Sequence, residues 1–307
     1  MHFSEPMAYF LQQVLNGLHG SALYALLAFG YSLTHGVIRR TNLAYGPVFA
    51  FCGQMAILFA AAAYDELWLI WPVALAIGIV AAFLYAALLG SVLARGVFAP
   101  LAESSPNTIV AATLGVAIML MELARIAADT RDYWLPPILA IPIVFVQWSG
   151  FKVTLTVIQL IDISIAALSL AAVVVLLQRS RIGRFWRAVS DDPLAASMCG
   201  IDVGRILAFS VIAGALLAAL AGCLAAVYFG NISLGTGLVF GLKVLFVTAV
   251  GGYRSPLRAA IGAAAVGMGE ALWTGYLPNE WRDVAVFIFL TVLLVLRPSD
   301  DAASSRI

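Results

Sequence analysis

The sequence VIQLIDISIAALSLAAVVVLLQ at residues 157–178 is followed by RSRIGRFWRAVSDDPLAASMCGIDVGR at 179–205 and by ILAFSVIAGALLAALAGCLAAVY at 206–228. Each outer stretch reaches the length of roughly 20 apolar residues that a bilayer-crossing helix needs. The stretch between them carries five basic residues, Arg179, Arg181, Arg184, Arg187 and Arg205. Two apolar spans joined by a basic, polar segment (Gln178–Arg205, called the polar segment below) predict a membrane protein with one prominent water-facing loop.

The composition of the whole chain supports this prediction. Of its 307 residues 63% are hydrophobic and 11% charged, and the mean hydropathy is +1.00, whereas soluble domains are about half apolar and about a quarter charged. The net charge of +1 gives no indication of nucleic-acid binding. Cys52, Cys199 and Cys223 lie far apart in the sequence, without metal-ligand or disulfide spacing, and are interpreted as small packing residues.

Apolar segments recur along the whole chain. The first lacks a basic start and a cleavage site, so it is expected to be a retained span. The second is short, and Gly251-Gly252 separates the seventh from the eighth, so the number of spans is eight or nine. The predicted fold is therefore an all-α polytopic bundle of 8–9 transmembrane helices forming one domain over residues 1–307. The nine segments lie at 8–35, 46–63, 68–94, 107–127, 157–178, 206–228, 238–253, 259–275 and 282–297.

The distribution of Lys and Arg predicts the orientation, because cytoplasmic loops are enriched in both residues. If the polar segment is cytoplasmic, most of the 17 basic residues fall on its side, including Arg39, Arg254, Arg297 and Arg306. Those on the opposite side are Arg131, Lys152 and Arg282. The N-terminus is therefore expected outside, the C-terminus in the cytoplasm, and a long external loop over residues 128–152.

Some charged residues fall inside the apolar segments, where they need a partner or a polar cavity. Glu122 and Arg125 are three residues apart and can pair on one helix. Lys243 and Glu270 lie on two segments that turn near Ser255 and would reach similar depth. These four residues are expected to form an intramembrane polar network. Structural pairing of Lys243 with Glu270 is favoured, with direct substrate contact as the alternative.

Sequence patterns of enzymes and metal sites are absent. His19 and His35 have no ligand-spaced partners, so a metal site is not expected. The chain has no GxxxxGK[ST] phosphate loop, nucleophile elbow or HExxH motif. We therefore expect neither an enzyme nor a nucleotide-hydrolysing subunit, and no cofactor.

The polar segment contains the pattern of a short, capped helix. Asp191-Asp192-Pro193 provides an acidic cap and a proline suited to the first turn. Leu194, Ala195, Ala196 and Met198 supply a small apolar face, and Gly200 can end the helix in a left-handed conformation. A merely solvated basic loop would account for the arginines but not for these caps.

Six blocks of the sequence, in the same order, resemble the H-type (LivH-like) permeases of branched-chain amino-acid ABC importers. They begin with QQVLNGLHGSALYALLAFGYSLTHGV and TNLAYG. RIGRFWRAVSDDPLAASMCGID, AGALLAALAGCLAAVYFG with GLKVLFVTAVGG, and GMGEALWTGYLPNEWRDVAVFIFLTVLLVLRP follow. The chain departs from the family at Tyr45, where His is usual, and in VGGYRSPLRAA, which carries Arg254, Pro256 and Arg258.

The resemblance implies a function and a set of partners. The polar segment would hold the coupling helix that docks on an ATPase, through Arg184, Arg187, Asp191, Ala195, Ala196 and Gly200. Asn42 and Tyr45 are candidate residues of the translocation path. The implied partners are a second homologous permease in a heterodimer, two ATP-binding cassette subunits that hydrolyse ATP, a periplasmic solute-binding protein and the lipid of a bacterial inner membrane.

The expected activity is import of branched-chain or other hydrophobic amino acids by ATP-driven alternating access. Permeases of the same family also carry urea, short amides and other amino-acid-like solutes, so these remain alternatives. A stand-alone secondary transporter or channel is a further alternative, although the few charges within the apolar segments are sparse for an ion relay. The binding protein is expected to supply most of the selectivity.

Overall fold

The computed structural model describes residues 5–102, 104–129, 131, 133–148, 151–233, 235–252 and 255–296. A helix covers each of the nine predicted apolar segments. These helices are α1 (Glu5–Ile38), α2 (Tyr45–Asp65), α3 (Trp71–Val92), α4 (Pro106–Ala127), α5 (Val157–Arg179), α8 (Val203–Phe229), α9 (Thr236–Gly251), α10 (Pro256–Tyr276) and α11 (Arg282–Leu296). The α-helical bundle is thus the fold of the protein.

Six of the described helices, α1 to α5 and α8, are long and apolar enough to cross a membrane. In one of these spans, α3 is continued by the π-helix η1 (Leu93–Phe98). This number is smaller than the eight or nine spans predicted from the sequence. Helices α9 and α11 have 16 and 15 residues, fewer than the roughly 20 that span the hydrocarbon core. Helix α10 has the length, but it carries Arg258 and Glu270 among many small residues.

The predicted external loop contains strands that the sequence analysis missed. β1 (Pro142–Trp148) pairs antiparallel with β2 (Phe151–Thr156), with an irregularity between Val144 and Val146. β-Branched residues concentrated in this stretch were the available signal. Thr156 then caps α5 and exchanges hydrogen bonds with Gln159 in a capping box, so the hairpin leads directly into the helix.

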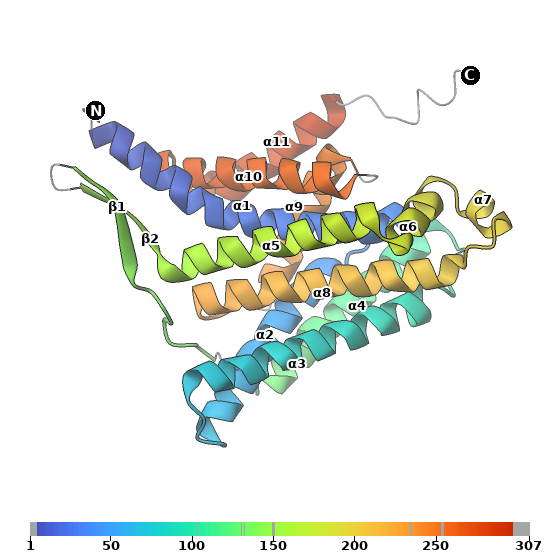
Figure 1. Cartoon of the computed structure of the whole chain (residues 1–307), viewed down its shortest axis with the longest axis horizontal. Helices are drawn as coiled ribbons and strands as arrows, with labels where there is room; N and C mark the ends of the chain where they lie inside the picture. The colour runs from blue at the N-terminus through green and yellow to red at the C-terminus, as the bar shows by residue number, and fades with distance from the viewer. Residues whose placement is uncertain are drawn as a thin grey trace.

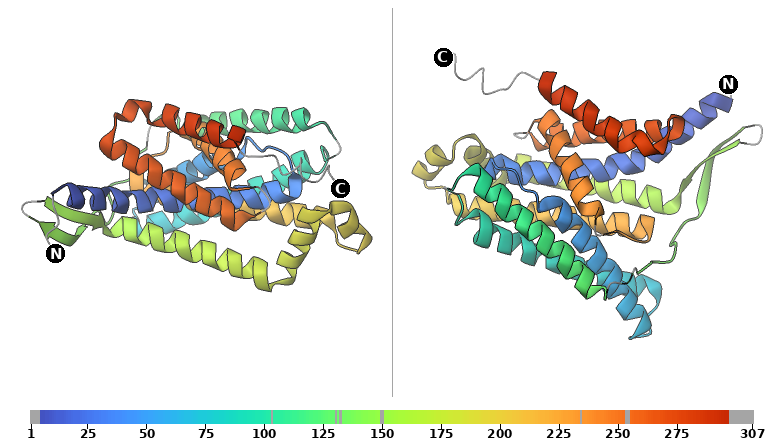
Figure 2. Two further views of the ribbon diagram at one scale, coloured as in Figure 1. Left: turned by 90° about the horizontal axis from the view of Figure 1, so that it is seen from above. Right: turned by 180° about the vertical axis from the view of Figure 1, so that it is seen from behind.

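The hairpin and the polar segment lie at opposite ends of the bundle. Within the polar segment the chain forms α6 (Arg181–Asp191) and α7 (Pro193–Met198). Figure 1 shows β1 and β2 at the left with the start of α1, and α6 and α7 at the right. Both views in Figure 2 show the same separation along the helices. The polar segment and the hairpin would thus face different sides of a membrane.

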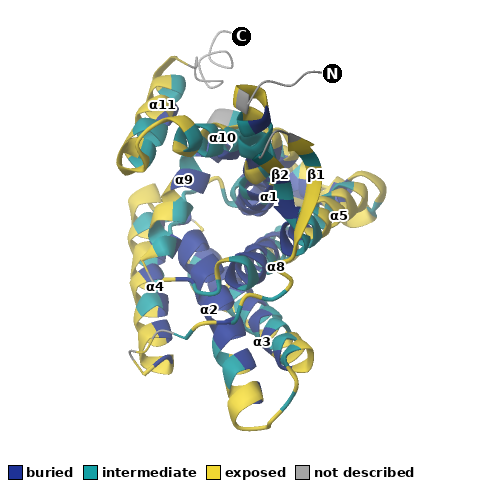
Figure 3. Cartoon of the chain, turned by 90° about the vertical axis from the view of Figure 1, so that its left-hand side faces the viewer, coloured by how far each residue is buried: buried dark blue, intermediate teal, exposed yellow. Residues whose placement is uncertain are grey.

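Burial divides the bundle into a centre and a periphery. Most residues of the apolar windows of α1, α2 and α8 are buried, whereas most of those of α3, α4 and α5 are not. Figure 3 shows α1, α2 and α8 as largely buried ribbons, with exposed faces on α4 and α5. Helices that are apolar all round yet exposed are suited to lipid. The peripheral helices therefore expose apolar faces suited to lipid, and the central ones form the core of the bundle.

Helices α2 and α9 cross with their backbones in contact. A Cβ atom added to Gly241 of α9 would lie 2.9 Å from the Cα and 3.2 Å from the backbone nitrogen of Gly46 of α2. A Cβ on Gly46 would overlap the backbone of Gly237 and Gly241. Backbone atoms cannot move aside as a flexible side chain can, so the crossing requires glycine on both helices.

The charge count that predicted the orientation rests partly on residues whose structure is not described. Arg254, Arg297 and Arg306 lie outside the described residues. Arg39 follows the end of α1, on the side of α6, whereas Lys152 lies in β2 of the hairpin and Arg131 follows the end of α4. Arg39 and Lys152 thus lie at opposite ends of the bundle, and the orientation itself stays a prediction.

We predict that Gly46→Ala lowers the thermal stability of the purified protein in detergent, because the added methyl group separates α2 from α9. Overpacking of this kind costs about 1–3 kcal/mol. Gly115→Ala on α4 is the matched control, since an added Cβ there meets no atom within 4 Å. Equal melting temperatures for the two variants would show that the crossing tolerates a side chain.

Candidate functional site

The polar segment folds into a short helix at the position predicted, and the caps determine where that helix begins. The Asp192 carboxylate accepts hydrogen bonds from the backbone N–H groups of Leu194 and Ala195 at 2.8 and 3.1 Å, and Pro193 occupies the first turn of α7. Asp191, predicted as part of the same start, is instead the last residue of α6. The cap residue of α7 is therefore Asp192.

The end of α7 is closed by a left-handed glycine. Gly200 has φ +80°, and its N–H donates to the Ser197 carbonyl at 3.0 Å. The N–H of Ile201 donates to the carbonyl of Ala196 at 3.1 Å. These two bonds form the Schellman arrangement. With both ends closed, this six-residue helix has a fixed geometry despite its shortness.

Helix α6 is anchored to α1 through a buried tryptophan. The indole N–H of Trp186 donates to the Leu33 carbonyl of α1 at 3.1 Å. The ring packs on Gly36, where a Cβ would lie 2.8 Å from a ring atom, and Val189 is fully buried beside it. Because the contact involves the α1 backbone, α6 cannot shift without affecting α1.

Two arginines add further attachments between the polar segment and the bundle. The guanidinium of Arg39, just after α1, donates to the carbonyls of Ser190 and Asp191 at 2.6 and 2.5 Å. Arg187 of α6 donates to the Leu177 carbonyl near the end of α5 at 3.0 Å. The end of α6 is therefore fastened to both α1 and α5.

The outer face of this unit is exposed and carries both apolar and basic groups. On α7, Leu194 is 69% exposed and Met198 81% exposed, and Ala195 is exposed beside them, whereas Ala196 is buried. On α6, Arg184 is exposed one turn from Arg187. The polar segment thus presents two large apolar side chains to water from a helix that is fixed to the bundle.

A second concentration of polar groups surrounds Lys243. Its side chain is 2% exposed, and the ammonium group contacts Glu270 Oε1 at 2.5 Å and Asp283 Oδ1 at 2.9 Å. The Tyr24 hydroxyl donates to Glu270 Oε2 at 2.8 Å, and Arg282 Nε donates to Asp283 Oδ1 at 3.0 Å. The structure brings Lys243 and Glu270 together and adds Tyr24, Arg282 and Asp283. We call these five residues the Lys243 cluster.

The other two residues of the expected network lie apart from this cluster. Arg125 bonds to the Glu122 carboxylate, with its Nε at 2.8 Å, and both side chains are about half exposed on α4. No ion pair or hydrogen bond in the described part of the chain joins them to Lys243 or Glu270. The expected network of four residues is therefore two separate sites, because α4 packs mainly on α2, whereas Lys243 and Glu270 lie on α9 and α10.

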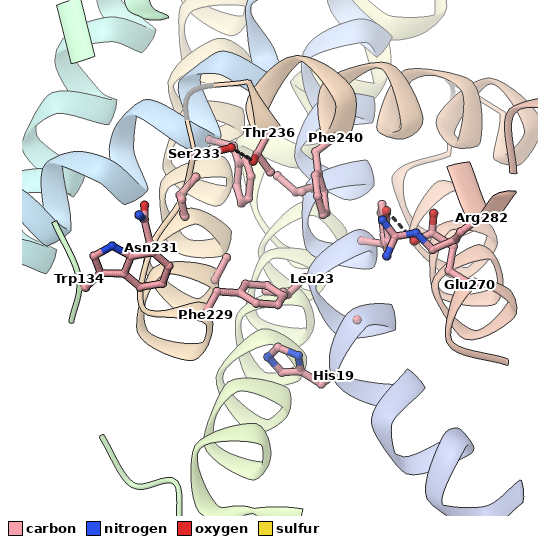
Figure 4. A pocket seen from close by; sticks show the side chains of 16 residues that line it. His19, Leu23, Trp134, Phe229, Asn231, Ser233, Thr236, Phe240, Glu270 and Arg282 are labelled. Carbon is pink, nitrogen blue, oxygen red and sulfur yellow. Dashed lines mark hydrogen bonds between the residues drawn. The ribbon is translucent and has the colours of Figure 1, made fainter. Parts of the chain in front are cut away.

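A cavity of about 640 Å³ adjoins the Lys243 cluster. Figure 4 shows Glu270 and Arg282 on one side of it, Trp134 and Asn231 on the other, and Phe240 with Thr236 above. Further apolar lining comes from α1, α2 and α8 through Leu23, Leu27, Phe49 and Phe229. Tyr24 also lines the cavity. It therefore has largely apolar walls and one charged side.

His19, treated from the sequence as isolated, also lines this cavity and has a buried partner. Its Nε2 lies 2.9 Å from Asp162 Oδ2 of α5, and its ring packs on Tyr228 with centroids 4.0 Å apart. The separation of 143 residues concealed the pair in the sequence. No group of three or more His, Cys, Asp or Glu residues able to hold a metal occurs among the described residues.

Asn42 and Tyr45, the candidate path residues, are buried at the turn between α1 and α2. Asn42 Oδ1 accepts from the Ala44 N–H at 3.0 Å and so shapes the turn. The Tyr45 hydroxyl lies against Gly30 and has no hydrogen-bond partner among the described residues. Neither residue lines the cavity beside the Lys243 cluster.

Comparison with known proteins places this arrangement in a family. Residues 13–296 match the family model described as the permease component of branched-chain amino acid transport systems. The high-affinity branched-chain amino acid transport system permease protein LivH of Escherichia coli (strain K12) is 31% identical, with 96% of each chain covered. LivH of Salmonella typhimurium is 30% identical over the same share. BraD of Pseudomonas aeruginosa is 28% identical over 95% of each chain.

The family model covers most of the chain, the relatives match it over nearly their full length, and the fold is a helical bundle with six helices able to cross a membrane. The relatives are permease components of transport systems and not enzymes. The chain belongs to the family of branched-chain amino acid transport permease components.

Proposed function

We propose that this chain is the membrane-spanning subunit of a binding-protein-dependent ABC importer that carries branched-chain or other hydrophobic amino acids across a bacterial inner membrane. The observation that carries the proposal is the anchored α6–α7 unit with its exposed apolar tip, in a chain whose sequence has no nucleotide-binding loop of its own. Such a unit is suited to receive force from a separate ATPase.

The attachments of α6 support this role. An ATPase docked on Leu194 and Met198 would move α7. Because both ends of α7 are capped, the helix would move as a unit and displace α6 instead of unwinding. Trp186 and Arg39 would then transmit it to the α1 end. Arg184 and Arg187, together with Ala195, Ala196 and Gly200, belong to the same coupling surface in this proposal, and Asp191 contributes through its carbonyl.

The substrate class is taken from the relatives. LivH and BraD are named for high-affinity transport of branched-chain amino acids, and identities near 30% over nearly whole chains make a related solute the natural choice for this chain. We further propose two ATPase subunits, a second homologous permease in a heterodimer and a periplasmic binding protein as partners. The proposed orientation has the polar segment and the C-terminus in the cytoplasm.

We predict that the double variant Leu194→Asp/Met198→Asp fails to co-purify with the ATPase of the same transport system. Two charges on the exposed tip of α7 would have to lose their hydration in an apolar interface, which costs at least several kcal/mol. The measurement is the ratio of ATPase to permease after affinity purification from membranes, together with ATP-driven leucine uptake.

Leu67→Asp is the control for this experiment. Leu67 is also an exposed leucine, but it lies in the turn between α2 and α3 and not in the polar segment. This variant should retain the ATPase at the wild-type ratio. If the double variant binds the ATPase as the wild type does, α7 is not the docking helix.

We also predict that the solute-binding protein of the same transport system is stabilised by leucine, isoleucine or valine in a thermal-shift screen. A ligand at 100 times its Kd stabilises the folded state by about 2.7 kcal/mol, which gives a measurable rise in melting temperature. Stabilisation by urea or a short amide, with none by these amino acids, would replace the proposed substrate class by that alternative.

A further inference from the structure

We propose that the cavity beside the Lys243 cluster is a transient binding site for the zwitterionic head group of a small apolar amino acid, with Glu270 binding the ammonium group and Arg282 binding the carboxylate. The inference rests on the proposed function, because it assigns a site to the same cargo within the membrane subunit. Nothing in the sequence comparisons assigns this site.

The hydrogen-bonding capacity of Glu270 allows it to accept an ammonium group. Its carboxylate can accept about four hydrogen bonds. Lys243 occupies one position on Oε1 and the Tyr24 hydroxyl one on Oε2. The side chain is 11% exposed and lines the cavity, so the remaining lone pairs are available to a bound group. Lys243 and Tyr24 hold the carboxylate in place from behind.

Arg282 has free donors for a carboxylate. Its Nε donates to Asp283, and its two terminal amino groups have no hydrogen-bond partner among the described residues. The side chain is 37% exposed and also lines the cavity. A guanidinium presents a planar fork of donors that matches the two oxygens of a carboxylate. Arg282 can therefore bind the second charge of the same head group.

The charge of the cluster selects a zwitterion over an ion. Lys243 and Arg282 are balanced by Glu270 and Asp283, and these pairs are already in contact. A bound solute with a net charge would leave that charge uncompensated in a poorly hydrated environment, which is unfavourable. An amino acid with an uncharged side chain supplies one group of each sign and leaves the sum at zero.

The remaining walls provide space for an apolar side chain. Phe49, Phe240, Leu23 and Leu27 line the cavity on helices α1, α2 and α9. The volume of about 640 Å³ lies within the range of roughly 300–1,000 Å³ found for small-molecule sites. A leucine-sized solute, with some water, can be accommodated between the charged side and these apolar walls.

Substrate protection of a single cysteine tests the proposal. Ser233 is exposed at the cavity, and Ser233→Cys changes only one atom. The exposed native cysteine is removed by Cys199→Ser, while Cys52 and Cys223 are buried. The permease with its co-purifying subunits, in lipid nanodiscs without the binding protein, is treated with a maleimide, and the labelling rate is measured with and without leucine.

We expect leucine to slow the labelling. Leucinamide lacks the carboxylate and N-acetylleucine lacks the ammonium group, so each should protect only at concentrations at least about tenfold higher than leucine. This factor is the effect of losing one charge-assisted hydrogen-bonded contact. Arg282→Gln should raise the protecting leucine concentration by a similar factor. Arg125→Gln, which removes an arginine of the exposed pair on α4, should leave it unchanged.

Two results would overturn the proposal: no protection by leucine, or equal protection by leucine and both derivatives. The comparison of leucine with leucinamide and N-acetylleucine does not use the Arg282→Gln variant, so it tests the binding site even if that variant does not fold. Leucine uptake by the unlabelled wild-type complex with its binding protein separates the two hypotheses. Uptake without protection contradicts this site alone, whereas no uptake of any branched-chain amino acid contradicts the proposed function.

Discussion

The structure depends on one property of lipid, which offers no hydrogen-bond partner to a polar group. Backbone groups are therefore bonded within helices, and charged side chains need partners within the bundle. Lys243 meets this requirement by contacting two carboxylates, one on α10 and one on α11. These ion pairs join α9, α10 and α11. Tyr24 of α1 donates a hydrogen bond to Glu270 of α10 and so connects this group to α1. The Lys243 ammonium group therefore links all three of the last helices, beside the glycine contacts that bring α9 against α2.

Local features of the bundle could be predicted from the sequence because each depends on neighbouring residues. A long apolar run favours a helix wherever that helix packs, and helices occur at all nine predicted segments. The caps of α7 come from residues within nine positions of each other, which is why Asp192 and Gly200 act at the ends predicted. Lys243 and Glu270 lie in consecutive apolar segments, so their depth could be compared from the sequence.

Features that depend on distant packing could not be predicted in this way. His19 meets Asp162 across 143 positions, and Asp283 joins Lys243 only because α11 folds back against α9. The cavity has walls from several helices and from Trp134 near the hairpin, and no short pattern describes it. A span count depends on helix length as well as on apolarity: six described helices have both, whereas α9 and α11 are apolar but have 16 and 15 residues.

The balance of charges beside the cavity has an electrical consequence. Moving one elementary charge through a membrane potential of 100 mV involves about 2.3 kcal/mol. Lys243, Arg282, Glu270 and Asp283 sum to zero, so a rearrangement that moves them together does almost no work against the potential. A zwitterionic solute adds no net charge to that movement. A movement of this charged wall of the cavity would therefore be nearly independent of the membrane potential, whether or not such a solute is bound.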